Sequence, residues 1–113
     1  MFETSMSQHN TPILRVNGKI IGNAVDALRH EMRTQIEQGG GHLILDLTDV
    51  PLLDSSALGA IIATLQALKK SDGRLVLLNP QEAVQNVLAV TRLDTVLEIF
   101  QDEADAVSAF SRG

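Results

Sequence analysis

The chain of 113 residues contains no cysteine, tryptophan or tyrosine. Without cysteine it can form neither a disulfide framework nor a zinc site built on thiolates. Aromatic residues make up only 3% of the chain, and all of them are phenylalanine. A stacking platform for nucleic-acid bases or sugars is therefore not expected.

Long apolar runs are also missing. None approaches the roughly 18 residues of a membrane span, so we expect no membrane insertion. The N-terminal segment Met1–Met6 lacks the basic region and the apolar core of a secretory signal. The expected location of the protein is therefore the cytoplasm.

Positive charge is scarce, with 9 Lys and Arg residues against 14 Asp and Glu residues and a formal net charge of −5. Phosphate contacts need clustered Lys or Arg, so no direct nucleic-acid binding is expected. The 44% hydrophobic and 20% charged content is typical of a globular domain. We expect residues 1–113 to form a single domain, with its core over about residues 12–110 and an edge strand or tail over residues 1–11.

Signatures of enzymes and nucleotide binders are missing as well. His9, His30 and His42 are scattered, without the spacing of a metal site. The glycines of residues 39–41 lie between a predicted helix and a predicted strand, which is the reverse of the order in nucleotide-binding loops. No Gly-x-Ser-x-Gly elbow is present. We therefore expect no metal, no cofactor and no enzymatic activity.

Strand-like and helix-like periodicities alternate along the chain. Strands are predicted at residues 2–8, 12–16, 43–50, 75–78 and 96–100. The predicted helices begin at the N-caps Asn23, Asp54, Asn79 and Asp102. Strands that alternate with helices imply parallel pairing, while a turn at His9–Asn10 would join the first two strands into a hairpin. The prediction is an α/β fold with a mixed, mostly parallel sheet and an antiparallel N-terminal edge hairpin.

The strand at 43–50 carries an acidic residue among apolar ones. Leu43, Leu45 and Leu47 share one face, and Asp46 lies on the other. We interpret Asp46 as structural support, a carboxylate that accepts hydrogen bonds from loop N–H groups. The alternative is that it holds the loop leading to Ser56.

Two hydroxyls and a carboxylate follow this strand, in Asp54-Ser55-Ser56. Functional groups in open α/β sheets gather beyond the carboxyl ends of the strands. Asp54 is the predicted N-cap, and the positive end of the helix dipole would tolerate a phosphate on Ser56. Taken alone, the triplet is more typical of ordinary helix capping than of a functional site.

Small residues continue along the same predicted helix. They include Ala57, Gly59, Ala60 and Ala63. One interpretation is a flat surface that a partner protein approaches closely. The other is a set of good helix formers on a solvated or half-buried face.

The segments 43–50 and 53–59 together resemble the signature of anti-sigma factor antagonists, the STAS domain family. That signature is an apolar strand ending in Asp-Leu-Ser or Asp-Leu-Thr, a short loop, and Asp-Ser-Ser-Gly-Leu. Segments 73–79 and 91–100 resemble later parts of the family, so the similarity extends over residues 12–110. The resemblance implies the STAS fold.

The resemblance also implies a function. The second serine of the family's Asp-Ser-Ser is phosphorylated, and the matching residue is Ser56. The unphosphorylated domain binds an anti-sigma factor with serine kinase activity and so regulates transcription indirectly. Phosphorylation by that partner, with ATP, breaks the complex. Asp54, Ser55 and Asp46 would support the phosphorylation site, and the kinase would supply the catalytic base.

Two positions depart from the family pattern. Ala57 stands where the family usually has glycine, and Ile21 stands where the family often has an acid in Gly-x-x-Asp. These departures favour a second interpretation, a constitutive STAS interaction or scaffold domain in a stress-signalling complex or beside a transporter. The oligomeric state, including a homo-oligomer, stays open at this point.

Overall fold

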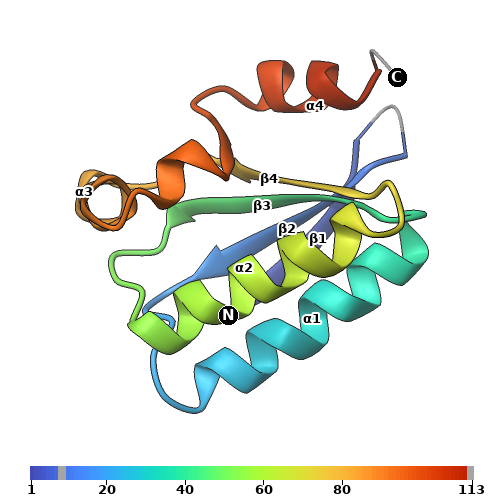
Figure 1. The fold of residues 1–113 in the computed structure, drawn as a ribbon. Coiled ribbons are helices and arrows are strands. Elements are labelled where there is room, and N and C mark those ends of the chain that lie inside the picture. The colour runs from blue at the N-terminus through green and yellow to red at the C-terminus, as the bar shows by residue number, and fades with distance from the viewer. Residues whose placement is uncertain (8–9, 112–113) are drawn as a thin grey trace.

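The computed structural model describes residues 1–7 and 10–111 (Figure 1). Within them a five-stranded sheet has the strand order β1-β2-β3-β4-β5. The strands are β1 (Phe2–Met6), β2 (Pro12–Asn17), β3 (His42–Asp49), β4 (Arg74–Leu78) and β5 (Glu98–Phe100). The helices are α1 (Ala24–Gln38), α2 (Ser55–Lys69), α3 (Glu82–Val90) and α4 (Glu103–Ser111), with a 3₁₀ helix η1 (Leu93–Thr95) before β5. β1 is antiparallel to β2 and the other neighbours are parallel, which confirms the predicted mixed sheet.

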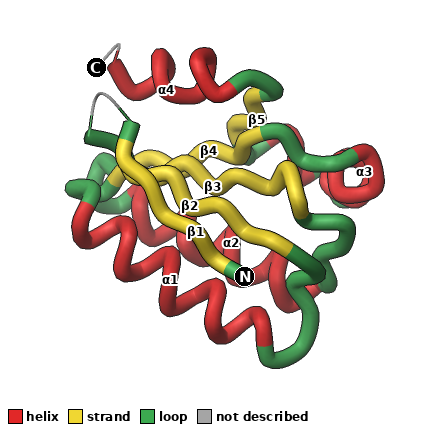
Figure 2. The backbone as a smooth tube through the Cα atoms, turned by 180° about the vertical axis from the view of Figure 1, so that it is seen from behind, coloured by secondary structure: helices red, strands yellow, loops and turns green. Residues whose placement is uncertain are grey.

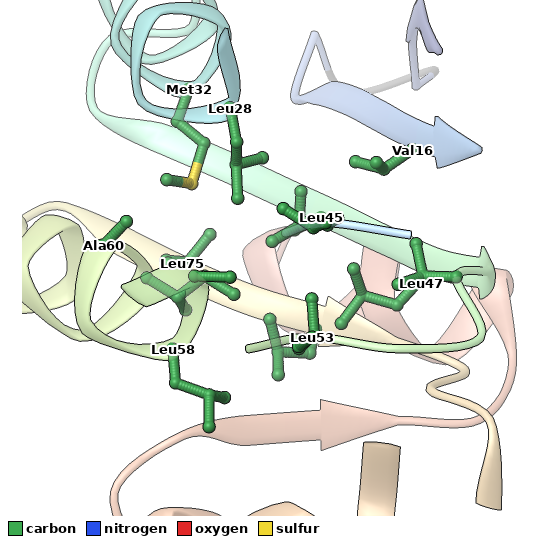
Figure 3. Close-up of a cluster of buried hydrophobic side chains, with 14 of the residues drawn as sticks. Val16, Leu28, Met32, Leu45, Leu47, Leu53, Leu58, Ala60 and Leu75 are labelled. Carbon is green, nitrogen blue, oxygen red and sulfur yellow. The ribbon is translucent and has the colours of Figure 1, made fainter. Parts of the chain in front are cut away.

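Helices cover both faces of this sheet. Figures 1 and 2 show α1 and α2 together on one face and α4 on the other. Leu43, Leu45 and Leu47 of β3 belong to the larger core beneath α1 and α2, and Leu45 and Leu47 are labelled in Figure 3. Ile44 points the other way, into a smaller core with Ala106 of α4. The predicted alternation of β3 is therefore confirmed, and it is what makes the fold three-layered.

The N-terminal strand pairs with β2 from Phe2 opposite Val16 to Met6 opposite Pro12. Phe2 packs against the larger core, whereas Met6 is 51% exposed. The hydrogen-bonded ladder, more than side-chain burial, therefore holds β1 in place. The predicted turn at His9–Asn10 falls partly outside the described residues, since these do not include His9.

The predicted N-cap Asn23 directly precedes α1, as expected, but its side chain does not cap the helix, and the predicted N-cap Asn79 is wrong. Asn23 has helical dihedral angles and makes no capping hydrogen bond with its side chain. Asn79 lies in the left-handed region with φ of +48°, and α3 begins later, after Gln81. The backbone N–H of Asn79 donates to the carbonyl oxygen of Phe100 at 2.7 Å, so this residue joins the end of β4 to β5. A tertiary hydrogen bond therefore displaced a local capping preference.

Arg74 holds α4 onto the sheet. Its Nη1 donates to the carbonyl oxygen of Ala109 at 2.7 Å, and its guanidinium lies 5.5 Å from the ring centre of Phe110. Its Nε donates to Glu98 Oε1 at 2.8 Å, and a second contact joins Nη2 to the same carboxylate. Hydrogen bonding to Glu98 raises the pKa of Arg74 against the opposing effect of burial, so the pairing favours the charged form of this anchor.

Gly39 sits where the end of α1 touches the start of β2, and its replacement tests that contact. A Cβ added there would lie 2.4 Å from Pro12 Cδ and 2.7 Å from the carbonyl oxygen of His42. Because ring and backbone atoms yield little, Gly39→Ala should lower the free energy of unfolding by about 1–3 kcal/mol. Urea denaturation followed by circular dichroism measures this change.

Gly59→Ala is the matched control for that experiment. Gly59 is helical, and nothing lies within 4 Å of an added Cβ. Replacing glycine by alanine in a helix should raise the free energy of unfolding by up to about 1 kcal/mol. Equal stability of the Gly39→Ala variant and the unmodified chain would contradict the close contact.

Candidate functional site

Two loops meet at the carboxyl end of the sheet, one after β2 and one after β3. Ile20 forms a parallel bridge with Leu53. The Ile20 N–H donates to the carbonyl oxygen of Leu52 at 3.0 Å, and the Asp54 N–H donates to the carbonyl oxygen of Ile20 at 3.2 Å. Ile20 and Leu53 are both buried, so the two loops are joined by main-chain bonds and by the core beneath them.

Asp54 connects these loops to α2. Its Oδ1 accepts from the Ala57 N–H at 2.8 Å, which confirms the predicted N-cap. Its Oδ2 accepts from the Gly22 N–H in the other loop at 3.1 Å. Leu53 and Leu58 flank this cap and belong to the same core, as Figure 3 shows. The beginning of α2 is therefore held by both oxygens of one carboxylate and by packed leucines.

Ser55 and Ser56 occupy the first two positions of α2, and both are exposed. Neither hydroxyl forms a hydrogen bond within residues 1–7 and 10–111. The positive end of the 15-residue helix lies beside them. The geometry thus presents two free hydroxyls on a rigid support, at a place that favours added negative charge.

Asp46 is supported by other partners. Its Oδ1 accepts from the Thr48 N–H at 3.0 Å and from the Thr48 hydroxyl at 2.6 Å. Its Oδ2 lies 3.2 Å from Arg15 Nε, and Arg15 also reaches Glu103 of α4 at 2.8 Å. Asp46 does accept a backbone N–H, but the donor, Thr48, belongs to β3 itself and not to a loop. The partners of Asp46 therefore lie in β3 and β2, and it makes no hydrogen bond or ion pair with the described residues of the loop that leads to Ser56.

The small residues of α2 separate into two sets. Ala57 and Ala60 are 0% and 1% exposed and belong to the larger core, so their predicted role on a partner surface is wrong. Gly59 and Ala63 are exposed, and the helical repeat places them on the same side as Ser56. The stripe predicted from sequence combined a buried face with an exposed one, because spacing alone does not show which way a helix is turned.

Two exposed apolar side chains in the loops that join α2 were not identified together from the sequence. The bridge between Ile20 and Leu53 directs both of those side chains inward, so their neighbours Ile21 and Leu52 point outward. Ile21 is 42% exposed and Leu52 is 43% exposed. Ile21 had been singled out only as a departure from a family pattern. The exposure of Leu52 follows from the pairing of the two loops, which has no local signal.

Metal ligands and membrane-spanning helices are two other features that bear on the function. Among the described residues no cluster of three or more histidine and acidic side chains is arranged to hold a metal ion. His42 packs its ring 5.1 Å from that of Phe110, and His9 lies outside the described residues. In the part of the chain described here, no helix has the length and apolar character needed to cross a bilayer.

The model that describes the STAS domain matches residues 4–106 of this chain. The chain belongs to the STAS domain family. The anti-sigma-B factor antagonist of Bacillus subtilis is 30% identical over 86 residues, which cover 76% of this chain and 78% of the relative. The resemblance recognised in the sequence is thereby confirmed.

Solved structures agree with this assignment. A crystal structure from Thermotoga maritima has a TM-score of 0.87 and 26% identity, and covers 96% of this chain and 93% of that one. The Bacillus cell fate determinant SpoIIAA, in its phosphorylated form, has a TM-score of 0.73 and 25% identity. That comparison covers 97% of this chain and 99% of SpoIIAA. The STAS chain described here is thus similar to anti-sigma factor antagonists, a regulatory class that binds proteins.

Asp54→Ala tests the joint between the loops and α2. It removes the acceptors for both the Ala57 and the Gly22 N–H groups. We expect the free energy of unfolding to fall by about 1–2 kcal/mol, the typical cost of losing an N-cap. Asp54→Asn keeps an acceptor for Ala57 and should lose less. Urea denaturation measures both variants.

Gln66→Ala is the control for these variants, since Gln66 is exposed on α2 and both residue types favour helices. Its stability should match that of the unmodified chain. Asp54→Ala unfolding at the same urea concentration as Gln66→Ala would contradict the structural role of Asp54.

Proposed function

We propose that this STAS chain is an anti-sigma factor antagonist controlled by phosphorylation of Ser56. In its unphosphorylated form it binds an anti-sigma factor that has serine kinase activity. The partner then transfers the γ-phosphoryl group of ATP to the Ser56 hydroxyl, whose proton is released, and ADP leaves. The phosphorylated chain dissociates from the partner. The chain itself contributes the acceptor hydroxyl and no catalytic group.

The observation that carries this proposal is the presentation of Ser56. The hydroxyl is exposed, has no hydrogen-bond partner among the described residues, and stands on a helix end that Asp54 holds by two bonds. A kinase can therefore reach it without unfolding α2. Ser55 is equally exposed. The choice of Ser56 comes from the family signature, in which the second serine of the pair is the one modified.

Electrostatics explain why a phosphate would end binding and yet leave the fold intact. Phosphorylation adds about −1.5 to −2 charges at neutral pH. The helix dipole stabilises that charge at the second position of α2. The exposed side chains of Ile21 and Leu52, by contrast, offer apolar surface, and a partner that contacts it must displace the water there. A strongly hydrated phosphate on the same end of α2 would retain water at this surface and so weaken the binding of the partner.

The relatives support the proposal through their own descriptions. The Bacillus subtilis relative is an anti-sigma-B factor antagonist, and a relative from Lysinibacillus sphaericus is an anti-sigma F factor antagonist. SpoIIAA has been solved both unphosphorylated and phosphorylated. A chain with this fold therefore accommodates a phosphate, as the proposed mechanism requires.

A second candidate is a constitutive STAS interaction domain that binds its partner without phosphorylation. The specific observation in its favour is the exposed, uncharged side chain of Ile21, which flanks the site where the family often has an acid. In this candidate the apolar surface serves permanent docking. The distinction is therefore whether Ser56 changes state.

Intact-mass spectrometry tests the phosphorylation directly. The purified chain is incubated with ATP and a purified candidate anti-sigma factor kinase. We expect one added phosphate on the unmodified chain and on Ser55→Ala, and none on Ser56→Ala. Loss of the phosphate only in Ser55→Ala would move the site by one residue. No phosphate, with a complex still formed, would favour the constitutive domain.

Binding measurements test the consequence of the charge. Ser56→Ala should bind the same kinase about as tightly as the unmodified chain. Ser56→Asp should bind at least about tenfold more weakly, because a charge at a dry contact lacks a compensating partner. Equal affinity of the two variants would refute the switch.

A further inference from the structure

A groove lies between α1 and α2, beside the face that carries Ser56. Its volume is about 510 Å³. All but the last of its lining residues come from the two helices, and they are Arg29, Arg33, Ile36, Glu37, Ala60, Ala63, Thr64, Ala67, Leu68 and Ser71. We call this feature the α1–α2 groove. The function proposed above makes no use of it.

One rim of the α1–α2 groove is a row of charges on α1. Arg29, Arg33 and Glu37 are spaced four residues apart, so they lie along one side of the helix. None of them forms an ion pair within the described part of the chain. Like charges four residues apart destabilise a helix slightly. Arg33 and Glu37 are an opposite-charge pair at the same spacing, but the exposed guanidinium groups of Arg29 and Arg33 make no ion pair with a carboxylate within the described residues, so both are available to a ligand.

The sign of this rim is opposite to that of the chain. The formal net charge is −5, yet the rim presents two arginines before its single carboxylate. A complementary ligand would be acidic opposite Arg29 and Arg33 and basic opposite Glu37. Because of this order of charges, a bound segment would have one preferred orientation along the groove.

The opposite side of the α1–α2 groove is mainly apolar, and its small side chains rise little above the backbone of α2. Ala63 and Ala67 are exposed, and their small side chains allow the backbone of another helix to approach closely. From Ala60 to Leu68 the lining runs along α2 for about 12 Å, at about 1.5 Å per residue, which is about two turns of a helix. The α1–α2 groove thus fits a helical segment better than a compact small molecule.

The groove is also continuous with the phosphorylation site. Ser56, Gly59 and Ala63 are exposed at helical spacing on α2, and Ala63 is part of the groove lining. A partner that covers Ser56 therefore meets the α1–α2 groove without leaving this face. Figure 1 shows the two helices side by side on the same face of the sheet.

We infer that the α1–α2 groove docks an amphipathic helix of the anti-sigma factor partner. Carboxylates of that helix lie against Arg29 and Arg33, a basic residue lies near Glu37, and its apolar side packs on Ala63 and Ala67. This inference rests on the proposed function and adds a second contact area to it. The groove contributes affinity and orientation, while Ser56 contributes control.

Isothermal titration calorimetry with the purified candidate kinase tests the charge contact. Arg33→Glu should bind at least about tenfold more weakly than the unmodified chain, and Arg29→Glu/Arg33→Glu more weakly still. Raising NaCl from about 50 to 300 mM should weaken binding of the unmodified chain more than that of the double variant. Arg92→Glu is the matched control, because Arg92 is exposed and lies after α3; it should retain full affinity.

A pair of alanine variants tests the shape of the groove. Ala63→Gln fills the groove and should weaken binding about tenfold or more. Ala89→Gln makes the same change at an exposed position of α3 and should leave binding unchanged. Thermal unfolding followed by circular dichroism shows that each variant is folded, so weaker binding reports on the surface itself.

The outcomes separate this inference from the proposed function. Normal binding by Arg33→Glu and Ala63→Gln would overturn the groove contact and leave the Ser56 switch standing. No binding by the unmodified chain would overturn the proposed function and, with it, the assigned occupant. Sedimentation velocity tests whether the groove binds a second copy of the chain instead. If the unmodified chain forms a dimer and Arg33→Glu is a monomer, the groove is a dimer interface, and docking of the kinase there is overturned.

Discussion

The carboxylate of Asp54 is the contact on which the functional end of this protein depends. One oxygen accepts from the Ala57 N–H and begins α2, and the other accepts from the Gly22 N–H and joins a second loop to that helix. The β-bridge between Ile20 and Leu53 is a second connection between the same two loops. The helix end that carries the exposed Ser56 hydroxyl is consequently held by groups from two loops and by the core, although this hydroxyl makes no hydrogen bond with the described residues.

The orientation of α2 separates stability from function. Ala57 and Ala60 are buried and pack the helix onto the sheet. Ser56, Gly59 and Ala63 point outward, so chemical change there alters the surface and leaves the core unchanged. This separation suits a protein regulated by modification, because added charge can weaken a complex at little cost to folding.

The opposite face of the sheet holds α4 by independent contacts. Asp46 is paired with Arg15, which reaches Glu103, while Arg74 binds the carbonyl oxygen of Ala109. These polar contacts surround the smaller core and share no residue with the Ser56 surface. The contacts that hold α4 on the sheet are therefore separate from the surface of α2 on which the proposed switch depends.

The order of strands and helices, the alternation of β3, the cap at Asp54 and the family signature were all predictable from sequence, because each depends on periodicity or on neighbouring residues. The start of α3 was not, because the Asn79 N–H bonds to Phe100, which is distant in the chain. The burial of Ala60 and the exposure of Leu52 likewise depended on how distant segments pack. The α1–α2 groove depended on the same packing, since it forms only where the arginines of one helix lie beside the alanines of another. Local sequence determined the elements and the candidate serine, whereas tertiary contacts decided which side chains reach solvent together.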